Sequence, residues 1–461
     1  MKGKSKEIGL IAGILIAVII QSITIPGLEG AGKTALALTL MTIVFWAAQV
    51  AQSGFTSGLL LVSYLIFGVA GPEVVFSPWL KPTMYLVIGA YLIADAVRSS
   101  GLGERIAYAF ILKFVKGFKS VIIAIFLLTF VLSLLIPHPW PRAFLIMAVM
   151  KVLIDSANVP RKDAITIGFT VFASSVPVSM IFLTGDAVIN PLAVQLSGVA
   201  VGWIKYFYLM GVPMIVASIL TCFLILFLFK PSQELVVNRE VLLEKQKELG
   251  AMSSLEKKTA TWLVIAIVLW LTDSIHGIDI GWITLLIPML MSLPVIGGVL
   301  TPKSWTTVPM NVLLFLTAAM AISAVGGATG MNAWIASVVF PETLPGNPFI
   351  FAFLIAVIGI IIHMLLGSVI AVMGIAIPAV LTGISASGSS ITPLIASLII
   401  YISVGIHYIF PFHHLNTLVG QGEENGMYTQ NETIKLGLPL TIVVFIVEAA
   451  AVLWWMVIGY I

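Results

Sequence analysis

The sequence predicts an all-α polytopic membrane protein with about 11 transmembrane helices and two opposed re-entrant hairpins, arranged as an inverted-topology repeat. Three observations predict it. The 461 residues are 60% hydrophobic and only 9% charged, and a mean hydropathy of +1.12 excludes a soluble domain. Apolar runs of helix-spanning length, about 20 residues, recur throughout the chain. Two further apolar stretches are interrupted by proline or glycine at equivalent places in the two halves of the chain.

The apolar runs taken in order give eleven crossings and four parts of the chain. The crossings are 7–23, 33–50, 57–71, 80–98, 163–184, 209–229, 259–275, 282–300, 310–328, 390–411 and 436–460. The parts are an N-terminal helix (1–32), a first inverted repeat (33–230) with an inner hairpin at 119–155, a cytoplasmic helical linker (231–258), and a second inverted repeat (259–461) with an outer hairpin at 348–383.

The first hairpin is predicted from the stretch 131–160, where an apolar run meets Pro137, Pro139 and Pro141 in close succession. Prolines at alternate positions remove N–H donors and clash with the preceding turn, so one continuous helix is excluded. Each flank is shorter than a crossing. A hairpin that dips into the membrane, with residues His138–Arg142 at its tip in a watery cavity, satisfies these limits. The alternative is a proline-rich surface loop between two short helices.

Basic residues predict the orientation. Lys2, Lys4 and Lys6 place the N-terminus in the cytoplasm, and counting crossings then places the inner hairpin, its basic flanks and the charged linker inside as well. Segment 101–118 alternates basic and apolar faces and is predicted to lie along the inner interface, as segment 331–346 does on the outside. No Lys or Arg occurs between Lys303 and Lys435, which agrees with an outer second hairpin and a C-terminus outside.

The two halves align with a constant offset of 229 residues. This offset pairs Gly101 with Gly330 and His138 with Gly367. Each half holds five crossings and one hairpin, and because five is odd the halves must have opposite orientations. Inverted repeats with broken helices are typical of secondary transporters, whose substrate site lies near the midplane where the repeats meet.

Four elements are predicted to converge at that midplane: the two hairpin tips and the polar breaks in crossings 163–184 and 390–411. Broken helices expose N–H groups that suit anions and carbonyl groups that suit cations. The candidate substrate-binding residues in these elements are His138, Trp140, Arg142, Ser174, Ser175, Thr184, Gly185, Ser368, His413, His414, Asn416 and Thr417.

Arg142 is the most informative single residue, because a permanent charge at membrane depth costs at least about 2.5 kcal/mol and marks functional sites. One hypothesis is that its guanidinium pairs with a substrate carboxylate. Arg142→Gln would then abolish binding and leave folding intact. The other is that Arg142 snorkels to the interface or pairs with Asp186 or Asp155 as a structural lock.

Histidines and carboxylates supply the remaining candidates. Five of the six histidines lie in or beside the four elements, so proton coupling is one hypothesis and packing groups held by hydrogen bonds are the alternative. His413 and His414 are adjacent, which is a weak metal pattern. Asp95 and Arg98 are predicted to face each other on one helix. The single cysteine, Cys222, is predicted to be a packing residue.

The tail FPFHHLNTLVGQGEENGMYTQNETIKLGL resembles the divalent-anion/sodium symporter family, in its Pro-rich, Asn-containing turn and its "xxIKxG" entry to the last helix. The resemblance covers nearly all of the chain after residue 33. It implies eleven crossings, opposed re-entrant hairpins, an interfacial helix before each hairpin, an outside C-terminus, a homodimer and carriage of dicarboxylate, citrate or sulfate. On this resemblance Ser368 and Asn416 are candidate ion-coupling residues. Asp186 is a third candidate, as a proton site, because it lies in a helix break, and the coupling ion expected is Na⁺ or H⁺.

The hairpin tips depart from the family pattern. Where the family has Ser-Asn-Thr, which helps bind sodium and substrate, this chain has His138-Pro139-Trp140 and Ser368-Val369-Ile370. The family's Gly-Thr-Pro-Pro-Asn turn is replaced by residues 185–189, which begin Gly-Asp. Sodium coupling is therefore the part of the resemblance that the residues support least.

The sequence as a whole predicts a secondary active transporter, not an enzyme, that moves a small dianion by alternating access. The substrate expected is a di- or tricarboxylate or sulfate, with no cofactor other than the coupling ion. The partners expected are the lipid bilayer and a second copy of the chain, and nucleic acid is not a partner. A proton-coupled or cation-independent anion exchanger is the alternative, and a membrane-embedded metalloenzyme is a remote one. The location expected is the plasma or inner membrane.

Overall fold

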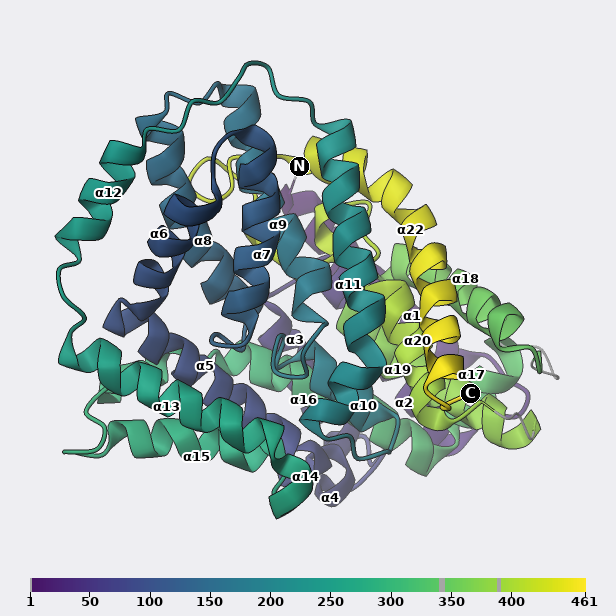
Figure 1. Cartoon of the computed structure of the whole chain (residues 1–461). Helices are drawn as coiled ribbons and strands as arrows, with labels where there is room; N and C mark the ends of the chain where they lie inside the picture. The colour runs from purple at the N-terminus through teal and green to yellow at the C-terminus, as the bar shows by residue number, and fades with distance from the viewer. Residues whose placement is uncertain (1, 340–344, 388–390) are drawn as a thin grey trace.

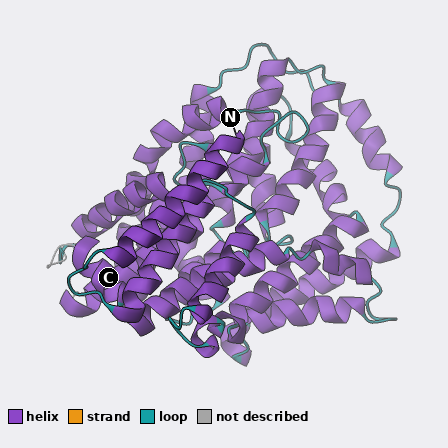
Figure 2. Cartoon of the chain, turned by 180° about the vertical axis from the view of Figure 1, so that it is seen from behind, coloured by secondary structure: helices purple, strands orange, loops and turns teal. Residues whose placement is uncertain are grey.

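The protein is helical throughout the described part of the chain. The computed structural model describes residues 2–339, 345–387 and 391–461, and these residues form helices and loops without a named strand (Figure 2). Of the predicted segments, residues 340–344 and 390 lie outside the described residues. Among the described helices, five are long and apolar enough to cross a membrane, or six if one bent pair forms a single span. This finding supports a polytopic membrane protein, and the count of eleven crossings stays a prediction.

A helix covers most of each predicted crossing, but its ends differ from the predicted bounds by up to eight residues, as at α15, which ends at Ser292 and not at residue 300. In the first half the helices are α1 (Lys2–Ser22), α2 (Gly30–Ala47), α3 (Ser53–Ile66), α4 (Pro72–Val75), η1 (Ser77–Leu80), α5 (Pro82–Ser100), α6 (Leu102–Phe114), α7 (Phe118–Ser133), α8 (Pro139–Ser156), α9 (Arg161–Ser179), α10 (Ile189–Leu196) and α11 (Trp203–Leu228). The linker holds α12 (Arg239–Glu248). The second half holds α13 (Ser254–Leu271), α14 (Asp273–His276), α15 (Ile280–Ser292), η2 (Pro302–Thr307), α16 (Met310–Thr329), α17 (Met331–Val339), α18 (Pro348–Leu366), α19 (Val369–Ser387), α20 (Pro393–Gly405), η3 (Pro411–His413), α21 (Leu415–Val419) and α22 (Gln430–Val457).

The core of the molecule is built from the interrupted helices. Nearly every residue of α9, α10 and α20 is buried, and α9 and α20 pack against α7, α18, α19 and α22 (Figure 1). By contrast, the outer helix α11 leaves large apolar side chains exposed, among them Ile219, Phe223 and Phe227. An apolar exterior around a buried polar centre is the arrangement expected of a protein solvated by lipid.

The glycines paired by the 229-residue offset occupy the same backbone conformation. Gly101 ends α5 with φ of 82°, and Gly330 ends α16 with φ of 78°. Only glycine adopts this left-handed conformation without strain, so each glycine ends one helix and permits a sharp change of direction. The turn at Gly101 bends the chain by 68° into α6, which covers most of the predicted interfacial segment 101–118.

Two pairs of helices, each joined by a short turn, lie where the sequence predicts hairpins. In the second, α18 ends at Gly367, whose φ is 62°, and α19 begins two residues later. In the first, α7 ends at Ser133 and α8 begins at Pro139 with His138 as its N-cap. The proline-rich tip is therefore shorter than predicted. Pro139 and Pro141 lie in the first turn of α8, because the missing N–H of proline is not needed there.

The linker is docked on α6. Arg105 of α6 bonds both carboxylate oxygens of Glu256, at 2.6 and 3.2 Å, and also the carbonyls of Leu249 and Gly250. Leu242 of α12 is buried in the same region. The linker contains one short helix, α12, and Arg105 holds the residues that follow it; the bounds of the linker and its cytoplasmic location stay predictions.

We expect this anchor to stabilise the fold in a pH-dependent way. The hydrogen bond from Arg105 holds the pKa of Glu256 at about 2, below its ordinary value of 4.5. The stabilisation is present above about pH 4.5 and is lost as the pH falls toward 2. Arg105→Ala should lower the melting temperature by a few degrees at pH 7 and by less at pH 3. Lys245→Ala, which breaks the exposed Lys245–Glu248 pair, is the matched control and should change little. Equal effects of both variants would contradict a special role for the anchor.

Candidate functional site

The two predicted helix breaks are present, and side chains of the breaks cap the helices that follow. After α9 ends at Ser179, Asp186 accepts hydrogen bonds from the N–H groups of Val188 and Ile189 at 3.0 and 3.2 Å, at the start of α10. After α20 ends at Gly405, His414 Nδ1 accepts from the N–H of Asn416 at 3.3 Å, at the start of α21. Both polar side chains therefore accept hydrogen bonds from backbone N–H groups at helix N-termini, which the breaks would otherwise leave unpaired.

Asn190 and Tyr401 connect the first break to α20. The amide of Asn190 donates to the carbonyls of Ser179 and Phe182 at 2.8 Å each, which closes the loop between α9 and α10. The hydroxyl of Tyr401 on α20 donates to Asn190 Oδ1. The sequence gives no specific indication of Tyr401, which looks like one more aromatic in an apolar run.

Arg142 is completely buried, and backbone groups surround its guanidinium. Its Nη1 donates to the carbonyls of Ile136 at 2.9 Å and Gly185 at 3.2 Å, and its Nη2 donates to Ser179 Oγ at 2.5 Å. Among the described residues it forms no salt bridge with Asp155 or Asp186. Arg142 therefore ties the first hairpin turn to the first break, and it does not line the pocket described below.

His138 and Trp140 belong to two further contacts. His138 Nδ1 accepts from the N–H of Trp140 at 3.2 Å, and its Nε2 lies 2.7 Å from the hydroxyl of Tyr91. Trp140 Nε1 donates to Asn416 Oδ1 at 3.0 Å, which joins the first hairpin to the second break. Asn416 in turn donates to the carbonyl of Ser175 at 3.4 Å. The side chain of Asn416, an ion-coupling candidate, is thus engaged by protein partners.

The other predicted residues of the breaks make local contacts. Ser174 pairs with Thr129 of α7 at 3.2 Å. Thr184 accepts from Trp203 Nε1 at 3.0 Å, and Thr417 bonds the carbonyls of Pro411 and His414 at 3.2 and 2.9 Å. These residues lie in the same buried region, and no metal site of three or more His, Cys, Asp or Glu side chains is formed by the described part of the chain.

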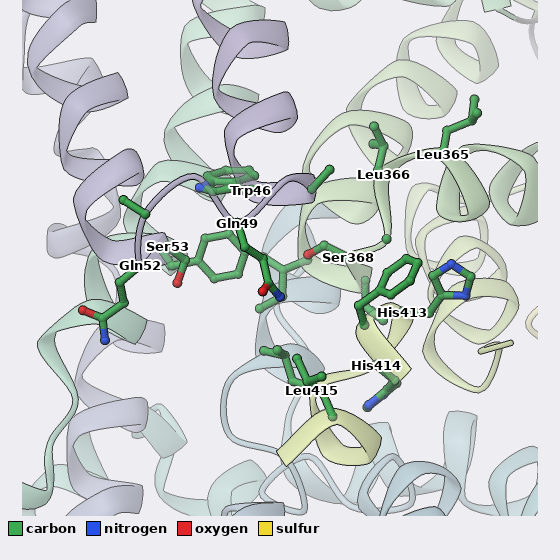
Figure 3. A pocket seen from close by; sticks show the side chains of 18 of the residues that line it. Trp46, Gln49, Gln52, Ser53, Leu365, Leu366, Ser368, His413, His414 and Leu415 are labelled. Atoms are coloured by element: carbon green, nitrogen blue, oxygen red, sulfur yellow. The ribbon is translucent and has the colours of Figure 1, made fainter. Parts of the chain in front are cut away.

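A pocket of about 470 Å³ opens between the second hairpin turn, the second break and the α2–α3 loop (Figure 3). Three predicted residues line it: Ser368, His413 and His414. The first residues of α19, Val369 and Ile370, also face it. The sequence reasoning missed Lys6 and the polar side chains of the α2–α3 loop, which are Gln49, Gln52 and Ser53. The cluster of two glutamines and a serine in an otherwise apolar region was the available signal.

A second cavity, of about 580 Å³, opens between α5 and α8. Tyr91, Asp95, Arg98 and Trp140 line it. Asp95 and Arg98 form the predicted pair, with Arg98 Nη2 2.6 Å from Asp95 Oδ1. Trp140 therefore faces a different cavity from Ser368, His413 and His414, and the predicted set is divided between two sides of the same buried polar centre.

Comparison with known proteins gives a whole-chain match. The model of a protein family described as "Sodium:sulfate symporter transmembrane region" matches residues 4–461. YflS of Bacillus subtilis (strain 168), named as a proposed malate transporter, is 27% identical over 287 residues, which are 59% of this chain and 60% of that protein. Dicarboxylate transporter 1, chloroplastic, of Spinacia oleracea is 28% identical over 342 residues, 70% of this chain and 59% of the relative.

A third relative is matched over more of its length. The inner membrane protein YbhI of Escherichia coli (strain K12) is 23% identical over 428 residues, which are 88% of this chain and 86% of that protein. For the first two relatives, however, the chain spans only about 60% of their length.

Proposed function

The chain belongs to the family of the sodium:sulfate symporter transmembrane region, and on this premise we propose that it is a secondary active transporter of a small dianion. A dicarboxylate such as malate is the substrate class we favour, because two relatives carry malate and dicarboxylate in their names. The proposal includes alternating access, re-entrant hairpins at 119–155 and 348–383, and the repeat boundaries predicted above. It also includes a cytoplasmic N-terminus, an outside C-terminus and a homodimer.

The observation that carries the proposal is the pocket at the second hairpin turn. Lys6 brings a positive charge, and Gln49, Ser53 and Ser368 bring neutral hydrogen-bonding groups. The N-terminal residues of α19 present the positive end of a helix, which favours anions. At about 470 Å³ the pocket has the size typical of small-molecule sites. An anion with two carboxylates suits this combination of charge and donors.

The second part of the proposal concerns the identity of the coupling ion. Sodium binds to oxygen ligands, and the family name includes sodium. In this chain, Ser368 is followed by Val369 and Ile370, whose side chains offer no oxygen, and Asn416 Oδ1 already accepts from Trp140. These features favour an anion exchanger or a proton-coupled carrier over a sodium symporter.

Thermal stabilisation of the detergent-purified protein tests the proposal. Succinate, malate, 2-oxoglutarate, citrate and sulfate are each added in sodium and in potassium buffer, and a bound ligand raises the melting temperature by mass action. We expect a dicarboxylate to raise the melting temperature equally in both salts. A shift that needs sodium would favour the symporter instead. A protein that responds to no dianion would contradict the proposed substrate class.

A further inference from the structure

Three imidazoles meet behind the pocket at the second break. His363 of α18 and His407 and His413 of the segment between α20 and α21 are each 1% exposed or less. His363 Nδ1 lies 3.3 Å from His407 Nδ1, and His363 Nε2 lies 3.0 Å from the carbonyl oxygen of His413. The ring of His413 also lines the pocket. The sequence alone gives no reason to join His363 to the other two.

The hydrogen bonds determine which nitrogen of each neutral ring carries the proton. His363 Nε2 faces a carbonyl oxygen, so it must donate and its Nδ1 must accept. The partner of that acceptor, His407 Nδ1, is then the N–H donor. His407 Nε2 is consequently a bare lone pair, buried and without a partner among the described residues.

His407 is the exception among the six histidines of the chain. His413 Nδ1 accepts from the N–H of Ile409, and His414 Nδ1 accepts from the N–H of Asn416. The Nδ1 atoms of His138 and His276 likewise accept backbone N–H groups. These four rings and His363 therefore carry the proton on Nε2, whereas His407 alone carries it on Nδ1.

We propose that the His407–His363 pair is a proton-binding site that couples protons to anion binding in the adjacent pocket, with His407 Nε2 as the receiving atom. The coupling half of this proposal rests on the proposed function. A proton forms a bond to the lone pair of His407 Nε2. The Nδ1–H bond of His407 then breaks as its proton moves to His363 Nδ1, so that His407 becomes neutral and His363 becomes the imidazolium. The Nε2–H of His363 stays bonded to the His413 carbonyl throughout.

The charge balance of the pocket explains why anion and proton would bind together. Among the side chains that line the pocket, Lys6 is the one with a permanent charge. A dianion beside Lys6 leaves one negative charge without compensation, and a proton on the His363–His407 pair supplies the second positive charge. By thermodynamic linkage, the anion must then strengthen proton binding by the same factor by which the proton strengthens anion binding.

Other titratable groups lie on the elements packed around α18, α20 and the second break. They are Lys33 of α2, Tyr401 of α20, Tyr408 and His414 of the break, and Glu432, Lys435 and Glu448 of α22. Glu448 is the competing proton site, because both of its carboxyl oxygens are buried without a hydrogen-bond partner among the described residues. Any test must therefore separate Glu448 from His407.

Nitrogen-15 NMR of the histidine-labelled, detergent-purified protein tests the site without any variant. At pH 8 we expect one of six histidine signals to show a protonated Nδ1 and a bare Nε2. On acidification the Nε2 of that ring should gain a proton as its Nδ1 loses one, a second ring should become an imidazolium, and 20 mM succinate should move the midpoint of this change to higher pH. Six rings with protonated Nε2 at pH 8, or a midpoint that succinate does not move although it raises the melting temperature of the protein, would overturn the proposal.

Proteoliposomes with an internal pH dye test the coupling. We expect a succinate gradient to acidify the lumen with the wild-type protein and with His276→Gln, which changes a histidine outside the pocket, and proton movement per succinate to fall at least tenfold with His407→Gln. Proton movement that survives His407→Gln and is lost in Glu448→Gln would assign the site to Glu448 and overturn the proposal. If no dianion is transported, but one ring has a protonated Nδ1 at pH 8 and changes on acidification as described, the proposed function fails while the proton site stands.

Discussion

Arg142→Gln is expected to destabilise the protein strongly, and not only to weaken anion binding. The guanidinium is the donor for the carbonyls of Ile136 and Gly185 and for Ser179 Oγ. Glutamine is shorter, so at least two of these buried acceptors lose their partner, and each unsatisfied group costs about 1–3 kcal/mol. We therefore expect a loss of about 3–5 kcal/mol of stability, measured as a large fall in melting temperature and in the yield of folded protein.

Arg142→Lys is the matched variant, because it keeps the charge and removes the planar fork whose Nη1 reaches two carbonyls and whose Nη2 reaches Ser179 Oγ. It should recover only part of the lost stability. If Arg142→Gln instead melts at the wild-type temperature and loses only the dianion-dependent shift, the structural role is wrong. The direct carboxylate contact predicted from the sequence would then be supported.

Ser368→Trp is expected to abolish dianion binding in a protein that still folds. Ser368 is partly exposed at the turn between α18 and α19 and faces the pocket of about 470 Å³. An indole there would occupy much of the space and block the N-terminus of α19. The lost hydroxyl accepts a weak capping bond from the N–H of Ala371 at 3.4 Å, so the stability cost is at most about 1 kcal/mol.

The measurement compares transport in proteoliposomes with the melting temperature of the same preparation. We expect at least a hundredfold loss of dicarboxylate uptake and no thermal shift on adding dicarboxylate. Ser99→Trp introduces the same side chain at an exposed position outside the lining residues and should transport normally. Uptake that survives Ser368→Trp would mean that the anion binds elsewhere, with the cavity lined by Asp95, Arg98 and Trp140 as the next candidate.

The sequence singles out Arg142, and in the structure its side chain is completely buried, whereas its role in substrate binding stays a prediction. Burial of a guanidinium in an apolar chain is visible from the sequence, because such a charge must have partners. The partners themselves are two backbone carbonyls and a serine hydroxyl from positions 136, 179 and 185. Every residue has a backbone carbonyl, so the sequence cannot indicate which carbonyls accept hydrogen bonds from Arg142. For this reason a carboxylate was the partner expected from the sequence.

The pocket shows a second limit of prediction from the sequence, which concerns contacts between distant segments. Ser368, His413 and His414 were predicted because they stand at a hairpin turn and at a helix break. Lys6 and the α2–α3 loop complete the pocket from segments more than 300 residues away in the chain. Nothing in a single sequence states that such distant segments meet.

The sequence by itself determined the class of the protein, the approximate positions of the helical segments, the breaks after α9 and α20, and the family. Each of these depends on local hydropathy, on the backbone preferences of glycine and proline, or on a linear motif. All three are properties of residues that are neighbours in the sequence. Only the tertiary structure decided which polar groups meet: Arg142 with three turn atoms, Trp140 with Asn416, and His363 with His407. A hydrogen bond requires a donor–acceptor distance of about 3 Å. Which side chains come that close depends on how helices remote in the sequence pack against each other.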